Sequence, residues 1–139
     1  MSFREKLDWI ALLSTLAIWG YYFLRLVQGH AAGAPAEAYL GLMVRCLVAS
    51  VIVQVVLVSI VSRRSPKEAS APLDERERMI ELTSTETAFY VLAGGVIAAA
   101  LGAAFGADVL QVVNAILAAL VLAEVVRAVR QILQLRRVA

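Results

Sequence analysis

Four long apolar stretches constrain what this chain can fold into more than any other feature of its sequence. They cover residues 9–24, 39–61, 88–107 and 109–126. A bilayer's hydrocarbon core is about 30 Å thick and is crossed by about 20 apolar helical residues, a length that each stretch reaches with its flanking residues. Because lipid offers the backbone no hydrogen-bond partners, only helices and closed barrels span a membrane, and these stretches lack the two-residue alternation of barrel strands. The sequence therefore predicts four transmembrane helices.

The expected fold class is all-α: a polytopic membrane protein whose single membrane domain, residues 1–139, is a four-transmembrane-helix bundle. The composition agrees, since 61% of the residues are hydrophobic and the mean hydropathy is +0.79, whereas soluble domains are about 45–50% apolar. The first stretch has 16 uncharged residues, more than the roughly 7–15 of a signal-peptide core, so we expect a retained span. The expected spans are about residues 7–28, 37–62, 86–107 and 108–130.

The lysines and arginines outside the spans all fall on one side of them. They lie before the first span, between the second and third, or after the fourth, whereas the first loop, residues 28–38, and the turn at 106–108 have none. An excess of lysine and arginine marks cytoplasmic loops. We therefore expect a multi-pass membrane protein with cytoplasmic termini. Direct nucleic acid binding is not expected, because the cations flank the spans and form no continuous stripe.

The cytoplasmic segment, residues 62–86, begins as a polar linker with two prolines and continues as a short helix from Asp74. Asp74-x-x-Glu77 has the spacing of an N-terminal capping box. Thr83-x-x-Glu86 offers a second box directly before the apolar run. The helix either enters the membrane unbroken or breaks at this second box, and the sequence leaves both alternatives open.

The segment Asp-Glu-Arg-Glu-Arg-Met-Ile-Glu-Leu at residues 74–82, followed by Thr87-Ala-Phe-Tyr-Val-Leu92, resembles a family of small prokaryotic four-helix membrane proteins of unknown function. In that family, an Asp-Glu-Arg-Asp/Glu motif precedes the third span and is followed by an isoleucine or a near equivalent. The resemblance implies a multi-pass location in the plasma (inner) membrane of a prokaryote. Similar proteins are often encoded beside helix-turn-helix transcriptional regulators, which implies that the motif docks a cytoplasmic regulator protein. The implied docking residues are Asp74, Glu75, Arg76, Glu77, Arg78 and Ile80.

Two other roles for this motif follow from its charges. Asp74 and Arg78 are four residues apart, and Arg78 and Glu81 are three apart, so the helix could pair its own charges on a solvated face. Alternatively, the arginines at the end of the fourth helix, whose apolar pattern continues toward Arg137, could contact the motif within the same chain.

Small residues recur at every fourth position of the third span, at Gly94, Ala98, Gly102 and Gly106. Residues four apart share a helix face, and small side chains let membrane helices approach closely. This face either packs against a neighbour within the bundle or forms the seam of a homodimer.

Polar side chains within the spans are costly in lipid, so they usually pair or face the bundle interior. Arg45 lies about 12 Å below the outer boundary at ~1.5 Å per residue, whereas Arg25 is close enough to the surface to reach the headgroups. We expect either a structural polar latch or an outward-facing pocket for an anion or substrate. The expected intramembrane polar cluster comprises Arg25, Arg45, Asp108, Gln111 and Asn114.

Near the inner end of the fourth span, Glu124 and Arg127 have the spacing of a helical ion pair, which we favour over a proton-coupling role for the carboxylate. Gln54 in the second span needs a hydrogen-bond partner at membrane depth. Cys46 is the only cysteine and is expected to be a small packing residue.

No catalytic residues, metal site or cofactor are expected. The sequence has no nucleophile elbow, phosphate loop or zinc-protease motif, and its single histidine, His30, cannot build an ordinary metal site alone. We therefore expect a non-enzymatic interaction or regulatory module that presents the acidic-basic helix of residues 74–82 to a partner. The alternative is a small transporter or channel with a polar site in the outer half of the bundle.

Overall fold

The computed structural model describes residues 3–72 and 74–137 and is helical over most of both ranges. Four of its helices are long and apolar enough to cross a membrane, which confirms the predicted all-α class and the number of candidate spans. The elements are α1 (Phe3–Ala31), η1 (Ala36–Tyr39), α2 (Leu40–Arg64), α3 (Pro66–Ala69), α4 (Glu75–Ala104) and α5 (Val109–Arg136).

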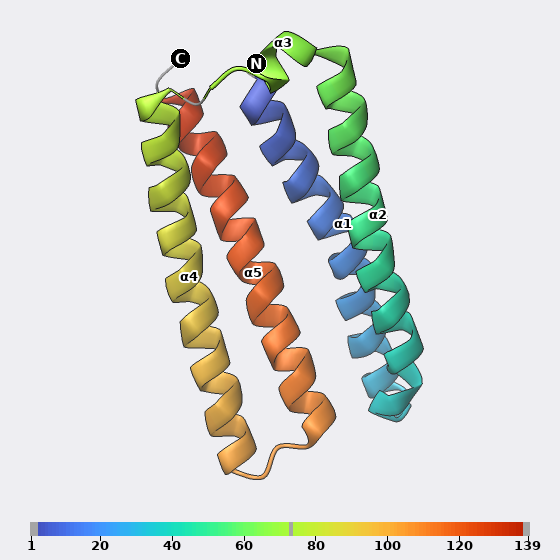
Figure 1. The fold of residues 1–139 in the computed structure, drawn as a ribbon. Helices are drawn as coiled ribbons and strands as arrows, with labels where there is room; N and C mark the ends of the chain where they lie inside the picture. The colour runs from blue at the N-terminus through green and yellow to red at the C-terminus, as the bar shows by residue number, and fades with distance from the viewer. Residues whose placement is uncertain (1–2, 73, 138–139) are drawn as a thin grey trace.

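The long helices stand side by side in the order α4, α5, α1, α2 (Figure 1). α4 packs most extensively against α5, and α1 bridges α5 and α2; among the described residues, no comparable packing joins α2 to α4 or α5. A short turn makes α4 and α5 antiparallel neighbours, as expected for brief connections in bundles. The start of α1, the end of α5 and α3 lie at one end of the molecule, here called the terminal end; η1 and the α4–α5 turn lie at the opposite end, here called the turn end.

α4 runs unbroken from the polar motif into the apolar run, so the structure selects the continuous helix of the two alternatives. Asp74 occupies the predicted N-cap position with an extended backbone, but its side chain forms no capping hydrogen bond. Thr83 does not start a new helix but lies inside α4, where its hydroxyl donates to the Met79 carbonyl oxygen at 2.9 Å. Thr87 likewise donates to the Thr83 carbonyl oxygen at 2.9 Å. Both threonines thus satisfy their hydroxyls within the helix.

α5 begins directly after Asp108, whose backbone N–H donates to Gln111 Oε1 at 3.2 Å. This bond satisfies one of the donors that every helix start leaves free. Asp108 and Gln111 therefore form a helix cap, a local role that the sequence analysis missed although the Asp-x-x-Gln spacing was visible. At its other end α5 continues to Arg136, which confirms the predicted extension of the fourth helix.

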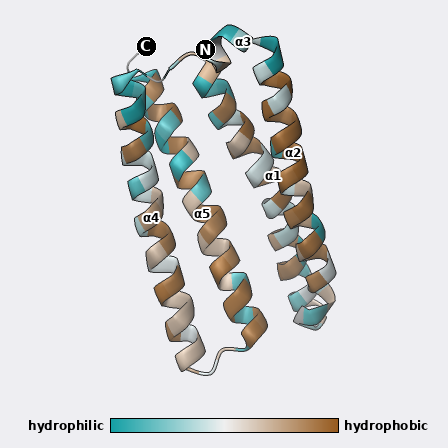
Figure 2. Ribbon diagram, in the orientation of Figure 1, coloured by the Kyte–Doolittle hydropathy of each residue, from teal (hydrophilic) through white to brown (hydrophobic). Residues whose placement is uncertain are grey.

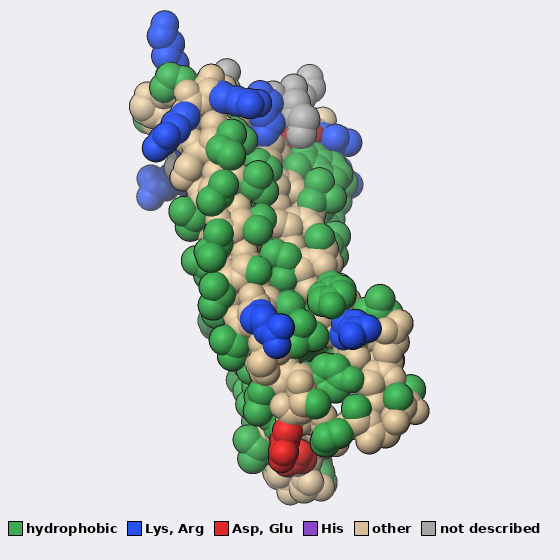
Figure 3. Space-filling model, turned by 90° about the vertical axis from the view of Figure 1, so that its right-hand side faces the viewer, with side chains coloured by type: hydrophobic (Ala, Val, Ile, Leu, Met, Phe, Trp, Pro, Cys, Tyr) green, Lys and Arg blue, Asp and Glu red, His purple; other side chains and the backbone are tan. Residues whose placement is uncertain are grey.

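Little of this fold is buried. One core cluster contains Trp19, Tyr22 and Cys46, and a second contains Leu12 and Ile132 with Ala128. Apolar side chains dominate the middle of the helices, and polar ones gather at the terminal end (Figure 2). The α2 face is largely hydrophobic over its length (Figure 3). Such extensive exposed apolar surface fits helices that face lipid and would make a soluble monomer prone to aggregate.

Candidate functional site

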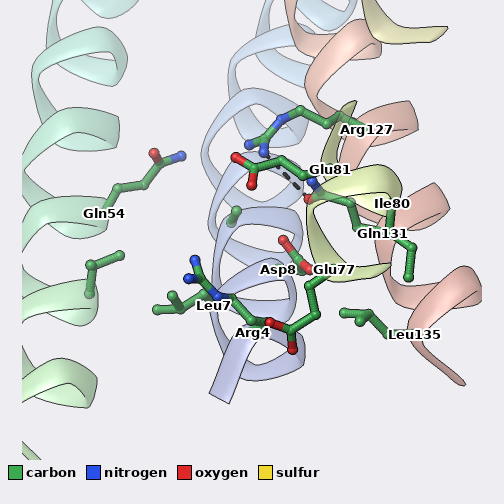
Figure 4. A pocket seen from close by; sticks show the side chains of 12 residues that line it. Arg4, Leu7, Asp8, Gln54, Glu77, Ile80, Glu81, Arg127, Gln131 and Leu135 are labelled. Carbon is green, nitrogen blue, oxygen red and sulfur yellow. Dashed lines mark hydrogen bonds between the residues drawn. The ribbon is translucent and has the colours of Figure 1, made fainter. Parts of the chain in front are cut away.

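A cavity near the terminal end, here called the four-helix cavity, is lined by side chains from all four long helices (Figure 4). Its volume is about 270 Å³. Its polar wall comprises Arg4 and Asp8 of α1, Gln54 of α2, Glu77 and Glu81 of α4, and Arg127 and Gln131 of α5. The other pockets of the described residues contain fewer charged side chains. One at the turn end has a single carboxylate and no arginine, and one between α4 and α5 has two arginines.

The cavity holds charged groups of both signs that do not pair with one another. Within residues 3–72 and 74–137, the two ion pairs are Glu124 with Arg127, at 2.8 Å, and Glu5 with Arg136, at 2.9 Å. The first confirms the predicted inner ion pair. Arg127 Nη1 also donates to Gln131 Oε1 at 3.4 Å, so its guanidinium is held at the cavity wall from both directions along α5.

On the α2 side, the cavity wall is tied to α1. Gln54 Nε2 donates to Thr15 Oγ1 at 3.5 Å, which supplies the hydrogen-bond partner expected for this amide. The bond joins α1 to α2, and hydrogen bonds of this kind contribute to the association of membrane helices. Gln54 therefore both links α1 to α2 and lines the cavity.

The motif at the start of α4 is divided between two surfaces. Glu77 and Ile80 are half-buried and line the four-helix cavity. Asp74, Glu75, Arg76 and Arg78 are exposed on the outside. Neither Asp74 with Arg78 nor Arg78 with Glu81 forms an ion pair in the part of the chain that the structure describes, so the expected self-pairing is not observed.

Beside the exposed half of the motif runs a shallow groove between α4 and the end of α5, here called the α4–α5 groove. Met79, Ile80 and Thr83 form its wall on α4, and Met79 is 59% exposed. Arg76 and Arg137 contribute the cationic groups that line it. The groove therefore combines exposed apolar surface with positive charge.

The other arginines at the end of α5 contact the same chain, but not the motif. Arg130 donates to the Thr87 hydroxyl on α4. Arg136 turns to α1 instead, where its Nε donates to Glu5 Oε1 at 2.9 Å and its guanidinium lies 5.5 Å from the centre of the Trp9 ring. Glu5 is nearly buried, with a side chain 12% exposed. This contact between the start of α1 and the end of α5 was not predicted, because residues 131 positions apart in the sequence form no local pattern.

At the turn end, the structure does not assemble the predicted intramembrane polar cluster. Arg45 is exposed, and its Nε donates to the Gly41 carbonyl oxygen of its own helix at 3.2 Å. Arg25 is also exposed. Asn114 instead accepts a 2.6 Å hydrogen bond from the buried Tyr22 hydroxyl. The latch through Arg45 is therefore wrong, because Arg45 is exposed and bonds to its own helix.

A pocket of about 530 Å³ does lie at the turn end, between α5 and the α1–α2 connection. Gln111, Asn114 and Asp108, three residues of the predicted polar cluster, line it. Its remaining polar lining comes from His30 and Tyr39 rather than from the two arginines. An anion would thus meet a carboxylate here, and no guanidinium lines the pocket.

A close contact between α4 and α5 lies one residue away from the predicted small-residue face. A Cβ added at Gly95 would overlap the Ala119 side chain and lie 3.3 Å from its Cα, whereas one added at Gly94 would meet open space. Gly106 is outside the helix, in the turn, with a φ of 92° that favours glycine. Of the predicted residues, Ala98 and Gly102 line a groove along this helix pair. The homodimer seam stays a prediction.

Within the described residues, no group of three or more histidine, cysteine or carboxylate side chains is placed to hold a metal ion. In comparisons with known proteins, no family model, curated protein or solved structure matches this chain.

Proposed function

We propose that the chain is a multi-pass protein of a prokaryotic plasma membrane, with both termini and the α2–α4 connection in the cytoplasm. The proposal is supported by the distribution of cations described above and by the fold, which brings these same segments to one end (Figure 1). Cysteine labelling tests it directly. In intact cells, Ala32→Cys should react with an impermeant maleimide, and Ser70→Cys should react only after the membrane is opened; the reverse pattern would contradict the orientation.

In this orientation the protein acts as a non-enzymatic interaction or regulatory module, and the α4–α5 groove with the exposed half of the motif forms the docking surface. The single observation that carries this proposal is the exposed Met79 beside Arg76 and Arg137 at the cytoplasmic end. Large apolar side chains ringed by arginine are typical of protein interfaces. The matching partner surface is an acidic helix with apolar side chains facing the groove.

Site-specific photocrosslinking in native membranes tests this docking surface. A photoreactive residue at Met79 should yield one discrete adduct with a cytoplasmic protein, and the same residue at Lys67 serves as the matched exposed control. Charge reversal of Arg76 and Arg137 should abolish the Met79 adduct, whereas charge reversal of Arg63 and Arg64 should not. An adduct that survives reversal of both groove arginines would contradict the proposal.

A second candidate function is transport through the turn-end pocket, because this pocket is large and has converging polar groups. It predicts solute flux in liposomes that depends on His30, which lines the pocket, and not on Arg45, which does not. Flux lost in His30→Ala and retained in Arg45→Ala would favour transport. Equal flux in both variants and in protein-free liposomes would remove this candidate.

A further inference from the structure

We propose that the four-helix cavity binds the head group of an amino-phospholipid, phosphatidylethanolamine, whose acyl chains lie along the space between α2 and α4. This inference rests on the proposed membrane placement but not on partner docking. It assigns a ligand to the cavity side of the motif, whereas the docking surface uses the exposed half; Ile80 lines both the cavity and the α4–α5 groove.

The charges of the cavity match a zwitterion. Arg4 and Arg127 supply planar guanidinium groups, which bind phosphate oxygens well. Asp8, Glu77 and Glu81 supply carboxylates that can each accept from a primary ammonium, which carries three donors. In Figure 4 these groups approach the cavity from α1, α4 and α5. In the described residues Asp8 forms neither an ion pair nor a hydrogen bond, so its half-buried carboxylate would gain from a cationic partner.

The position of the cavity favours a lipid as the source of this zwitterion. Its walls include Gln54 and Val58 of α2 and Ile80 of α4, yet α2 and α4 do not pack against each other. A ligand can therefore enter from the side, between the two helices. Asp8 lies five residues into α1, about 8 Å from its start at ~1.5 Å per residue. That depth is the level of the inner headgroups in the proposed placement.

The size of the cavity favours a head group over a whole ligand. Its volume of about 270 Å³ lies just below the roughly 300–1,000 Å³ of pockets that enclose drug-sized molecules. The acyl chains then remain outside, against the exposed apolar face of α2, where Val51 and Val55 are 58% and 60% exposed. Phosphatidylcholine has the same phosphate but no N–H donors, and phosphatidylglycerol has no cation, so neither satisfies both sets of groups.

Native mass spectrometry of the full-length protein in detergent tests the proposal. Phosphatidylethanolamine, phosphatidylcholine and phosphatidylglycerol of identical chains are added separately, and free phosphoethanolamine is the soluble alternative. Phosphatidylethanolamine should be retained at least about tenfold more tightly than phosphatidylcholine. Equal retention of these two lipids would overturn the proposal, and free phosphoethanolamine binding as tightly as the lipid would overturn the lipid source.

The variants Asp8→Asn and Glu81→Gln should each reduce the preference for phosphatidylethanolamine over phosphatidylcholine. Arg4→Gln should weaken the binding of all three lipids. Glu75→Gln and Arg63→Gln are matched controls, because they remove exposed charges outside the cavity. Circular dichroism identifies variants that fail to fold, and Glu81→Gln serves if Asp8→Asn does not fold. A full preference in every folded cavity variant would refute the site.

Discussion

α5 forms one helix–helix interface with α4, here called the α4 seam, and another with α1, here called the α1 seam. The two differ in the kinds of side chain that form them. The α4 seam depends on small residues, with Gly95 pressed against Ala119. The α1 seam depends on large and polar side chains: Tyr22 bonds to Asn114, and Glu5 bonds to Arg136 near the other end. In lipid, close contact and hydrogen bonds replace the hydrophobic effect between helices. The α4 seam combines close contact with hydrogen bonds near the terminal end, from Arg130 to Thr87 and from Ser84 to Gln134, whereas the α1 seam has hydrogen bonds near both ends.

This difference predicts which substitutions should destabilise each interface. The α4 seam should fail through added volume at one point, since two backbones can approach only while both sides stay small. In the α1 seam, the losses of stability caused by removing each hydrogen bond should add, because the two bonds lie at opposite ends of the helices.

The largest effect is expected at Gly95. Gly95→Ala places a methyl group onto the Ala119 side chain, so α4 must move, and we expect a loss of about 1–3 kcal/mol in the free energy of unfolding. Gly94→Ala is the matched control, because the same methyl group meets open space there. Denaturant titration in the same detergent measures both. Equal losses of stability at the two glycines would contradict the contact between Gly95 and Ala119.

Loss of the Tyr22 hydroxyl should have the next largest effect. Tyr22→Phe keeps the ring but leaves Asn114 Oδ1 without its donor, which should cost about 1 kcal/mol. Tyr21→Phe, at an adjacent position where the side chain is exposed, should change stability little. The same titration compares them, and a neutral Tyr22→Phe would remove the hydrogen bond as a source of α1–α5 stability.

A smaller loss is expected at the other end of that seam. Arg136→Gln removes the ion pair with Glu5 and the contact with Trp9, and because the Arg136 side chain is 58% exposed, the loss should stay below about 1 kcal/mol. Arg137→Gln is the control on the next residue. Thermal unfolding at low and high salt measures the difference, which should shrink as salt screens the pair. A loss that grows with salt would contradict the ionic origin.

The smallest effect is expected at Arg45. Its hydrogen bond is to its own helix, so Arg45→Ala should change the free energy of unfolding by less than about 0.5 kcal/mol. Thermal unfolding beside Asn114→Ala provides the comparison, since Asn114 joins two helices. A destabilisation by Arg45→Ala that matches the Asn114 variant would restore the polar latch across the bundle.

The sequence predicted the local features of the fold well and its pairings poorly. The Glu124–Arg127 pair and the N-cap position of Asp74 were predictable, because both depend on spacing within one helix. Asn114 was correctly chosen as a polar residue that needs a partner, but the partner is Tyr22 rather than Arg45. Tyr22 carried no signal of its own, since an aromatic residue near a membrane boundary is usually explained by the interface.

The number of long helices, their apolar character and the position of the cations on one side of the spans can all be read from the sequence, since each depends on composition along the chain. Only the tertiary structure decided which faces meet. One residue along a helix turns a side chain by about 100°, so a shift from Gly94 to Gly95 exchanges open space for contact with Ala119. Rotation about the helix axis follows from the packing of several helices at once, and no local pattern encodes it.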